Sequence, residues 1–363
     1  MSQKIRDKCT INYCQITDKD SKRINILKAW FTIMVVFIHS YSESINFSTG
    51  VVDYETPYWL EILKYTVSQC ISRCAVPGFF MLSAILLYRT SFSWKENVKK
   101  KIRTLLVPYV LINSAWIIIY FVCQHISKLS IYFSNEDNII ANWGMMDWLQ
   151  AYGILGGYPI TYPLWFLRDL FILNIFAVVY KKIVEKLKWA SLLLIALIWL
   201  FAKVSWAQAV CFWGVGCFIV CNNIKLNMLD QIKKGILYVI YFLAIVGDIL
   251  TRIYKINWSV HNICIIIGII FWFVCLTDFK ADKWNKVLLF ISSYSFSIYL
   301  FHELSLSFLQ KICARLLPTS ATAQLLEYLL IPIFIIIVIL IFSSALKKAC
   351  PRLYGIITGN RRQ

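Results

Sequence analysis

The sequence predicts an all-α membrane protein with about ten spanning helices, and three observations carry that prediction. First, 59% of its 363 residues are hydrophobic, against about 45–50% in a soluble globular chain, and the mean hydropathy is +0.65. Second, aromatic residues make up 16% of the chain, which suits a protein with aromatic belts at two membrane–water interfaces. Third, apolar runs approaching the roughly 20 residues of a spanning helix recur along the chain.

Ten apolar runs qualify as spanning helices. In chain order they are 24–46, 68–88, 102–124, 163–181, 189–203, 207–222, 236–252, 259–277, 287–308 and 325–346. The fifth and sixth are short and are separated only by "KVSW". One broken or re-entrant pair is therefore the alternative for these two runs.

The distribution of charge predicts that both ends of the chain are cytoplasmic. In that orientation the cytoplasmic segments carry 27 of the 37 Lys and Arg residues, the external loops carry seven, and three lie inside helices. Such a bias marks the cytoplasmic side, and two cytoplasmic ends require an even number of helices. Because the polar N-terminus lacks the apolar core of a signal peptide, we expect an N-terminal tail over 1–22, a membrane domain over 23–346 and a C-terminal tail over 347–363.

Composition also argues against nucleic-acid and metal sites. The net charge of +18 comes from basic residues that flank apolar runs, so it reads as topology information rather than as a nucleic-acid surface. The twelve Cys residues include no CxxC pair with metal-ligand spacing. Most lie within apolar segments, where a free Cys behaves as a small hydrophobe. We therefore expect membrane lipids as partners, with no nucleic acid and no metal.

Ionisable residues within the membrane are the first candidates for function, because a charge at mid-bilayer costs about 2.5–3.5 kcal/mol on insertion scales. The candidates are Lys28, His39, Arg73, Arg168 with Asp169, and His302 with Glu303. A helical rise of ~1.5 Å per residue places all of them except Lys28 in the outer half of the membrane, where one polar cavity can hold them. The alternatives are snorkelling of the isolated cations, packing pairs for the two doublets, and a structural hydrogen bond for His39.

Cations also gather at the cytoplasmic start of the third run, in "KENVKKKIRTLLVPY". A helix N-terminus with several cations suits a phosphorylated ligand, and a positive-inside anchor is the alternative. In the outer half, a His can act as general base toward a sugar hydroxyl, while an Arg or a Trp N–H stabilises the oxyanion. Acyl-coenzyme A would link the two regions, because its arm is of the same order as the ~16 Å rise from Lys28 to His39.

Residues 125–162 form a long external loop between the third and fourth runs, with many aromatic residues and several Gly. Long loops on a scaffold often carry binding functions, and a packed cap without a ligand is the alternative. No internal repeat is visible in the sequence. An inverted-repeat transporter therefore gains no support.

Five blocks, in order, resemble the bacterial membrane-bound acyltransferase 3 family, whose members O-acylate cell-surface glycans. They are "RINILKAWFTIMVVFIHSY", "ISRCAVPGFFMLSAILLYR", "VKKKIRTLLVPYVLINSAW", "YPLWFLRDLFIL" and "FISSYSFSIYLFHELSL". By this resemblance, His39 matches the family's proposed catalytic His, and ten helices is the family's usual number. Three positions depart from the family pattern: Lys28 stands where Arg is usual, Lys100 replaces the first Arg of a motif that ends at Arg103, and Ala84 stands where Gly is usual.

The resemblance implies a multi-pass O-acyltransferase, most simply an O-acetyltransferase, in the bacterial cytoplasmic (inner) membrane. It would move an acyl group from cytoplasmic acetyl-CoA to a hydroxyl of a capsular, exopolysaccharide or lipid-linked glycan, with His39 as general base or transient acyl carrier. The donor is expected to bind Lys28, Lys100 and Arg103. The acceptor and oxyanion side is assigned to Arg73, Trp165, Arg168, His302 and Glu303. A lipid-linked glycan flippase or transporter and a membrane glycan polymerase are the alternatives from other classes.

Overall fold

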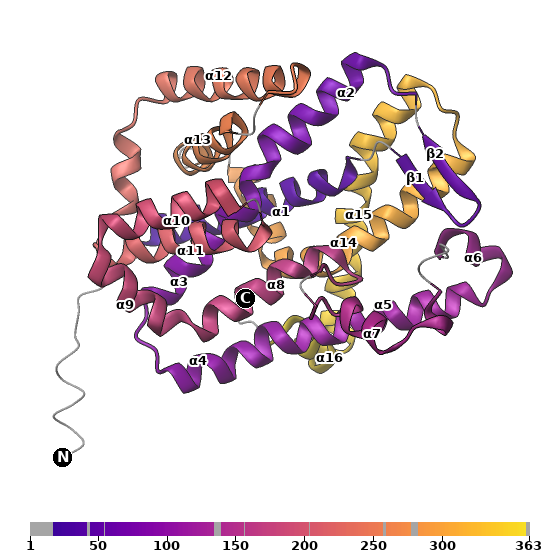
Figure 1. The fold of residues 1–363 in the computed structure, drawn as a ribbon, viewed down its shortest axis with the longest axis horizontal. Coiled ribbons are helices and arrows are strands. Elements are labelled where there is room, and N and C mark those ends of the chain that lie inside the picture. The colour runs from indigo at the N-terminus through magenta and orange to yellow at the C-terminus, as the bar shows by residue number, and fades with distance from the viewer. Residues whose placement is uncertain are drawn as a thin grey trace.

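A computed structural model of the protein describes residues 17–41, 44–53, 55–133, 139–155, 157–202, 204–256, 259–276 and 282–360. Most of these residues are helical (Figure 1). Several parts of the sequence prediction lie outside the described residues. They are 1–16 and 361–363 of the expected tails, 42–43 of the first run, Lys203 at the end of the fifth run, residue 277 of the eighth run, and 134–138 and 156 of the long loop.

The helical elements follow one another along the chain with few strands between them. They are α1 (Asp18–Ser40), α2 (Tyr58–Tyr65), the π-helix η1 (Thr66–Ile71), the 3-10 turn η2 (Ser72–Cys74), α3 (Ala75–Tyr88), α4 (Trp94–Lys101), the π-helix η3 (Ile102–Leu106), α5 (Val107–Gln124), α6 (Ser127–Phe133), η4 (Ile140–Asn142), α7 (Met145–Ala151), η5 (Tyr162–Leu164), α8 (Trp165–Ile175), α9 (Ala177–Leu187), α10 (Trp189–Ala202), α11 (Ser205–Cys221), η6 (Leu226–Gln231), α12 (Lys234–Ile253), α13 (Ser259–Cys275), α14 (Asp282–Leu316), α15 (Ala321–Ala349) and α16 (Pro351–Thr358).

Among the described residues, six helical segments are long and apolar enough to cross a membrane. They are Asp18–Ser40, Tyr58–Tyr88, Trp94–Gln124, Lys234–Ile253, Lys283–Leu316 and Ala321–Ala349. A seventh is reached if Tyr162–Ile175 and α9, which meet at a bend of 69°, count as one broken span. The shorter apolar helices α10, α11 and α13 overlap the remaining predicted runs. The chain is thus an all-α, multi-pass membrane protein, and the count of ten crossings and the cytoplasmic termini stay predictions.

The first predicted helix has different ends in the structure. α1 begins at Asp18, because Thr17 and Asp20 form a capping box that satisfies backbone groups at the helix start. It ends at Ser40, and residues 44–46 belong instead to the strand β1 (Ser44–Phe47). β1 pairs antiparallel with β2 (Gly50–Asp53), a hairpin that the apolar pattern did not predict.

α1 lies at the centre of the bundle and packs against α3, α14 and the η1–η2 turns (Figure 1). The Phe31 ring of α1 approaches Gly78 of α3 so closely that a Cβ at that glycine would overlap it. α3 and α11 are equally close, because a Cβ on Gly216 would overlap the Met81 carbonyl and lie 2.8 Å from the Ala84 Cβ. Gly216 thus leaves room for Ala84, the position at which the related family usually has glycine.

The hairpin and α6 of the long loop lie together at one edge of the molecule (Figure 1), where the Ser48 N–H donates to the Ile131 carbonyl at 3.1 Å. This edge is on the predicted external side. On the predicted cytoplasmic side, α16 packs against α5 and α15. Gly359, at φ +73°, ends α16 against the backbone of Thr104, so residues 351–358 of the expected tail form a helix packed on the bundle.

Candidate active site

His39 lies near the outer end of α1 and meets His302 of α14 and Tyr162 of η5. The ring centres of His39 and His302 are 5.1 Å apart, and those of His39 and Tyr162 are 5.9 Å apart. Because α1 is one helix from Asp18 to Ser40, the rise from Lys28 to His39 is ~16 Å, as the sequence predicted. The fold therefore brings together two predicted site residues that lie far apart in the chain.

His302 is fully buried, and backbone carbonyls fix the tautomer of its neutral ring. Its Nδ1 lies 2.9 Å from the Tyr299 oxygen and 3.1 Å from the Ile298 oxygen. Both partners are acceptors, so Nδ1 must carry the hydrogen and, in the neutral ring, Nε2 keeps the lone pair. That Nε2 is buried and has no hydrogen-bond partner among the described residues. The Nε2 atom of His302 is therefore a hydrogen-bond acceptor close to His39.

Arg73 supplies a positive charge near His39. It belongs to η2, and its Nε donates to Gln69 Oε1 at 2.6 Å. The guanidinium lies close enough to interact electrostatically with His39 and Tyr162. The preceding turn is the π-helix η1, and π-helical turns recur at functional sites. The structure thus brings His39 close to both His302 and Arg73, and the outer cavity expected around them stays a prediction.

Trp165 begins α8 directly after the turn that holds Tyr162. Its ring centre is 6.1 Å from that of Phe80. The Tyr299 hydroxyl donates to the Pro163 carbonyl at 2.5 Å, which ties α14 to this turn. Trp165 therefore packs among aromatic side chains next to the site. Its predicted oxyanion role stays a prediction. Tyr162 itself was not among the predicted site residues, although it is the first residue of the matched block "YPLWFLRDLFIL".

Glu303 is not the partner of its neighbour His302. Its side chain is half-buried, and one buried carboxylate oxygen has no hydrogen-bond partner among the described residues. It interacts electrostatically with Lys311 of the same helix and with Tyr120 of α5. It also interacts electrostatically with Tyr162 of the site, and the role assigned to Glu303 on the acceptor side stays a prediction.

Arg168 holds the long external loop. Its Nη1 donates to the Gly153 and Gly157 carbonyls at 2.8 and 2.7 Å, and its Nε donates to Asp169 Oδ1 at 3.0 Å. These contacts match the alternative of a packing ion pair. Gly153 takes part at φ +61°, a conformation that favours glycine. The predicted acceptor role of Arg168 is not tested by this geometry.

The predicted donor residues lie away from the two imidazoles. Lys28 is half-buried in α1, with its Nζ 3.5 Å from Asn25 Oδ1. Lys100 of α4 and Arg103 of η3 are exposed. Exposed cations on the predicted cytoplasmic side can bind an anionic ligand from solution. Binding of the acyl donor by these residues stays a prediction.

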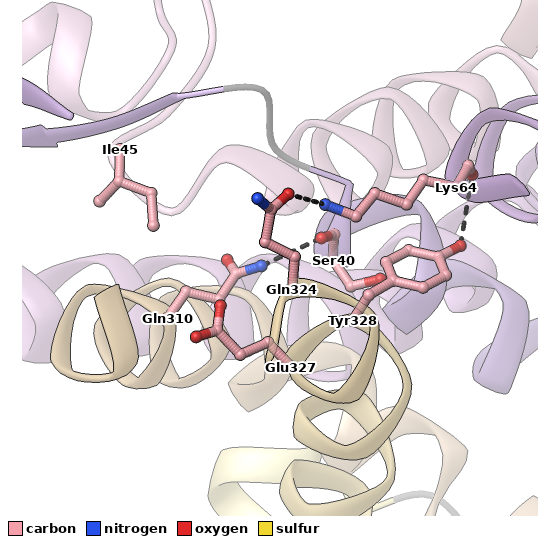
Figure 2. Close-up of a pocket in the computed structure, with 7 residues that line it drawn as sticks. All are labelled: Ser40, Ile45, Lys64, Gln310, Gln324, Glu327 and Tyr328. Carbon is pink, nitrogen blue, oxygen red and sulfur yellow. Dashed lines mark hydrogen bonds between the residues drawn. The ribbon is translucent and has the colours of Figure 1, made fainter. Parts of the chain in front are cut away.

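A second polar group lies just beyond His39, at the outer end of α1. A small pocket there is lined by Ser40, Ile45, Lys64, Gln310, Gln324, Glu327 and Tyr328 (Figure 2). Lys64 is 7% exposed, and its Nζ lies 3.5 Å from Gln324 Oε1. Gln310 donates to the Ser40 carbonyl at 3.0 Å, which fixes the chain as it leaves α1. The sequence did not single out this group, because Lys64 appeared only as an external-loop charge.

Neither metal ligation nor disulfide bonding is present among the described residues. No group of three or more His, Cys, Asp or Glu side chains there could hold a metal ion. The ten cysteines within the described ranges are free.

Comparison with known proteins identifies the family of the chain. A family model for an acyltransferase domain matches residues 21–347. The chain belongs to the acyltransferase 3 family. This acyltransferase is 22% identical over 355 residues to "Succinoglycan biosynthesis protein ExoH" of Rhizobium meliloti (strain 1021), an alignment that covers 94% of the chain and 92% of the relative. No solved structure matches it. Membership confirms the resemblance of the five blocks and does not support the flippase or polymerase alternatives.

Proposed function

We propose that this acyltransferase moves an acetyl group from cytoplasmic acetyl-CoA to a hydroxyl of a cell-surface glycan, in the bacterial inner membrane. The observation that carries the proposal is the pairing of His39 with His302 beside Arg73. The acceptor class is supported by the relative whose printed name concerns succinoglycan biosynthesis. An exopolysaccharide, a capsular glycan or their lipid-linked precursor fits that class.

In the proposed reaction His39 is the general base. It takes the proton of the acceptor hydroxyl as that oxygen attacks the thioester carbonyl, and a C–O bond forms. The Arg73 guanidinium stabilises the resulting oxyanion. The C–S bond then breaks, and the departing coenzyme A sulfur takes the proton from the His39 imidazolium. The products are the acetylated glycan and free coenzyme A.

His302 is proposed as a positioning residue rather than as a proton donor to the oxyanion. Its Nε2 carries a lone pair, because Nδ1 donates to two carbonyls. That lone pair can accept a hydrogen bond from one N–H of His39, which leaves the other His39 nitrogen free as base. A base oriented by a third group is the arrangement that activated nucleophiles commonly use.

The proposed donor path runs along α1. Lys28, Lys100 and Arg103 would hold the phosphates on the cytoplasmic side, and the pantetheine arm would cover the ~16 Å rise to His39. Lys28 offers a single compact charge, whereas Arg offers a planar fork. We therefore expect Arg103 to make the stronger phosphate contact.

The experiment uses the full chain in nanodiscs with acetyl-CoA labelled in the acetyl group and deacylated glycan from the producing cells. Wild-type protein is expected to release coenzyme A and to label the glycan. His39→Ala should lower labelling by about 10²–10⁴-fold, the usual contribution of a general base. His125→Ala is the matched control, because His125 is exposed beyond the end of α5. Labelling unchanged by His39→Ala would contradict the proposal.

A further inference from the structure

A separate cleft opens between α2 and α12, on the predicted external side. Its volume is about 400 Å³, within the range of small-molecule sites. Figure 1 shows the two helices at the same edge of the molecule. The polar and aromatic lining consists of Tyr58, Glu61, Tyr65, Arg252 and Lys255, and three isoleucines complete it.

Arg252 contacts several of the other polar and aromatic residues at the cleft. Its Nη2 lies 2.9 Å from Glu61 Oε1 and 3.0 Å from the Tyr41 hydroxyl. Its guanidinium carbon lies 4.4 Å from the centre of the Tyr65 ring. The cleft therefore presents flat aromatic and guanidinium faces in fixed positions, together with a carboxylate.

A line of polar residues joins the cleft to the candidate active site. Glu61, Tyr65, Gln69 and Arg73 follow at intervals of four residues along the continuous segment Tyr58–Tyr88, which includes the π-helix η1 and the 3-10 turn η2. Arg73 bonds to Gln69 and interacts electrostatically with Tyr65. At ~1.5 Å per residue, Glu61 and Arg73 are separated by ~18 Å along the segment.

The chemistry of the cleft suits a sugar better than an anionic headgroup. Sugar rings have apolar faces that pack on aromatic rings and hydroxyls that bond to carboxylate and guanidinium groups. The carboxylate of Glu61 already offsets the charge of Arg252 at 2.9 Å, which lowers the attraction of that guanidinium for a phosphate and leaves Lys255 as the second cation of the lining. The isoleucines and Tyr58 leave room for an apolar ring face.

We propose that this cleft is a second acceptor subsite, which binds a sugar several residues away from the hydroxyl that is acylated. The proposal rests on the proposed function, since it assumes a glycan acceptor at His39. It adds that the enzyme binds a run of linked sugars. Oligosaccharides long enough to reach from Arg73 to Glu61 should therefore bind more tightly and react faster than shorter ones.

The test uses the full chain in nanodiscs and a length series of oligosaccharides, made by partial hydrolysis of deacylated glycan from the producing cells. Tyr58→Ala and Lys255→Ala are the variants. Trp59→Ala is the matched control, because Trp59 is 53% exposed and Tyr58 is 59% exposed, yet Trp59 does not line the cleft. Dissociation constants and kcat/KM for acetyl transfer are measured at each length.

Tyr58→Ala should weaken binding of the long oligosaccharides ~2–10-fold, the equivalent of one lost aromatic contact. The shortest acceptors and acetyl-CoA should be unaffected, and Trp59→Ala should match wild type. Equal effects of Tyr58→Ala at every length, no effect at any length, or a change only in bound phospholipid would overturn the subsite. His39→Ala distinguishes the two proposals, because loss of transfer in that variant upholds the proposed function whatever the cleft variants do.

Discussion

His302 holds its imidazole 5.1 Å from that of His39, with its Nδ1 hydrogen shared between two carbonyls of its own helix. Each of these contacts comes from a regular helix, α1 or α14. Sites built on regular elements are positioned more accurately than sites on loops. The orientation of this pair is therefore a property of the bundle core.

Replacement of His302 by Asn tests its positioning role. In His302→Asn the side-chain amide can still donate to the Tyr299 or Ile298 carbonyl, but the Nε2 lone pair is lost. We expect kcat to fall by a smaller factor than the ~10²–10⁴ of a general base, with KM for acetyl-CoA unchanged. Steady-state kinetics check this. An unchanged kcat, or a loss that appears only in KM, would assign His302 to packing.

Arg73 is expected to act on the transition state. Arg73→Ala should lower kcat by ~10²–10³-fold, the cost of removing one oxyanion donor, while acetyl-CoA binding stays the same. Gln69→Leu should lower kcat less, because it removes only the 2.6 Å support of Arg73 Nε. Measured donor affinity is the control. A large rise in KM with normal kcat would instead make Arg73 a ground-state binding residue.

Arg168 is expected to stabilise the long external loop. Arg168→Ala removes the bonds to the Gly153 and Gly157 carbonyls, and hydrogen bonds to charged groups contribute ~1.5–3 kcal/mol each. Hydrogen exchange and limited proteolysis across 139–155 should therefore speed up. Lys128→Ala, an exposed change in the same loop, is the control. An unchanged exchange rate together with lost acetyl transfer would favour the acceptor role.

Gly216 is expected to tolerate no side chain. Gly216→Ala should destabilise the protein by ~1–3 kcal/mol, as overpacking usually does, because its Cβ would overlap the Met81 carbonyl. Gly235→Ala is the control, since nothing lies within 4 Å of a Cβ there. Adding Ala84→Gly to Gly216→Ala should restore part of the loss. Thermal unfolding in detergent measures all three, and equal midpoints for the two single variants would contradict the close approach of α3 and α11.

Sequence reasoning located the helices and the pair of imidazoles because both depend on local signals. Apolar length identified the runs, and the cost of a buried charge identified His39 and His302. It missed the hairpin because the predicted run was extended through residues 41–46, which are mostly polar, and because the pairing of β1 with β2 has no apolar signature. It also left the partners of Arg168 and Lys64 open, since long-range contacts such as Arg168 to Gly157 depend on how loops fold back.

The packing of α16 sets the minimal folding unit. The Tyr354 hydroxyl lies 3.0 Å from Ser297 Oγ of α14, five residues before His302, and Gly359 closes on Thr104 beside Arg103. A chain shortened to residue 346 would leave Ser297 without this partner and uncover α5. Expression of an isolated membrane domain should therefore extend to at least Asn360.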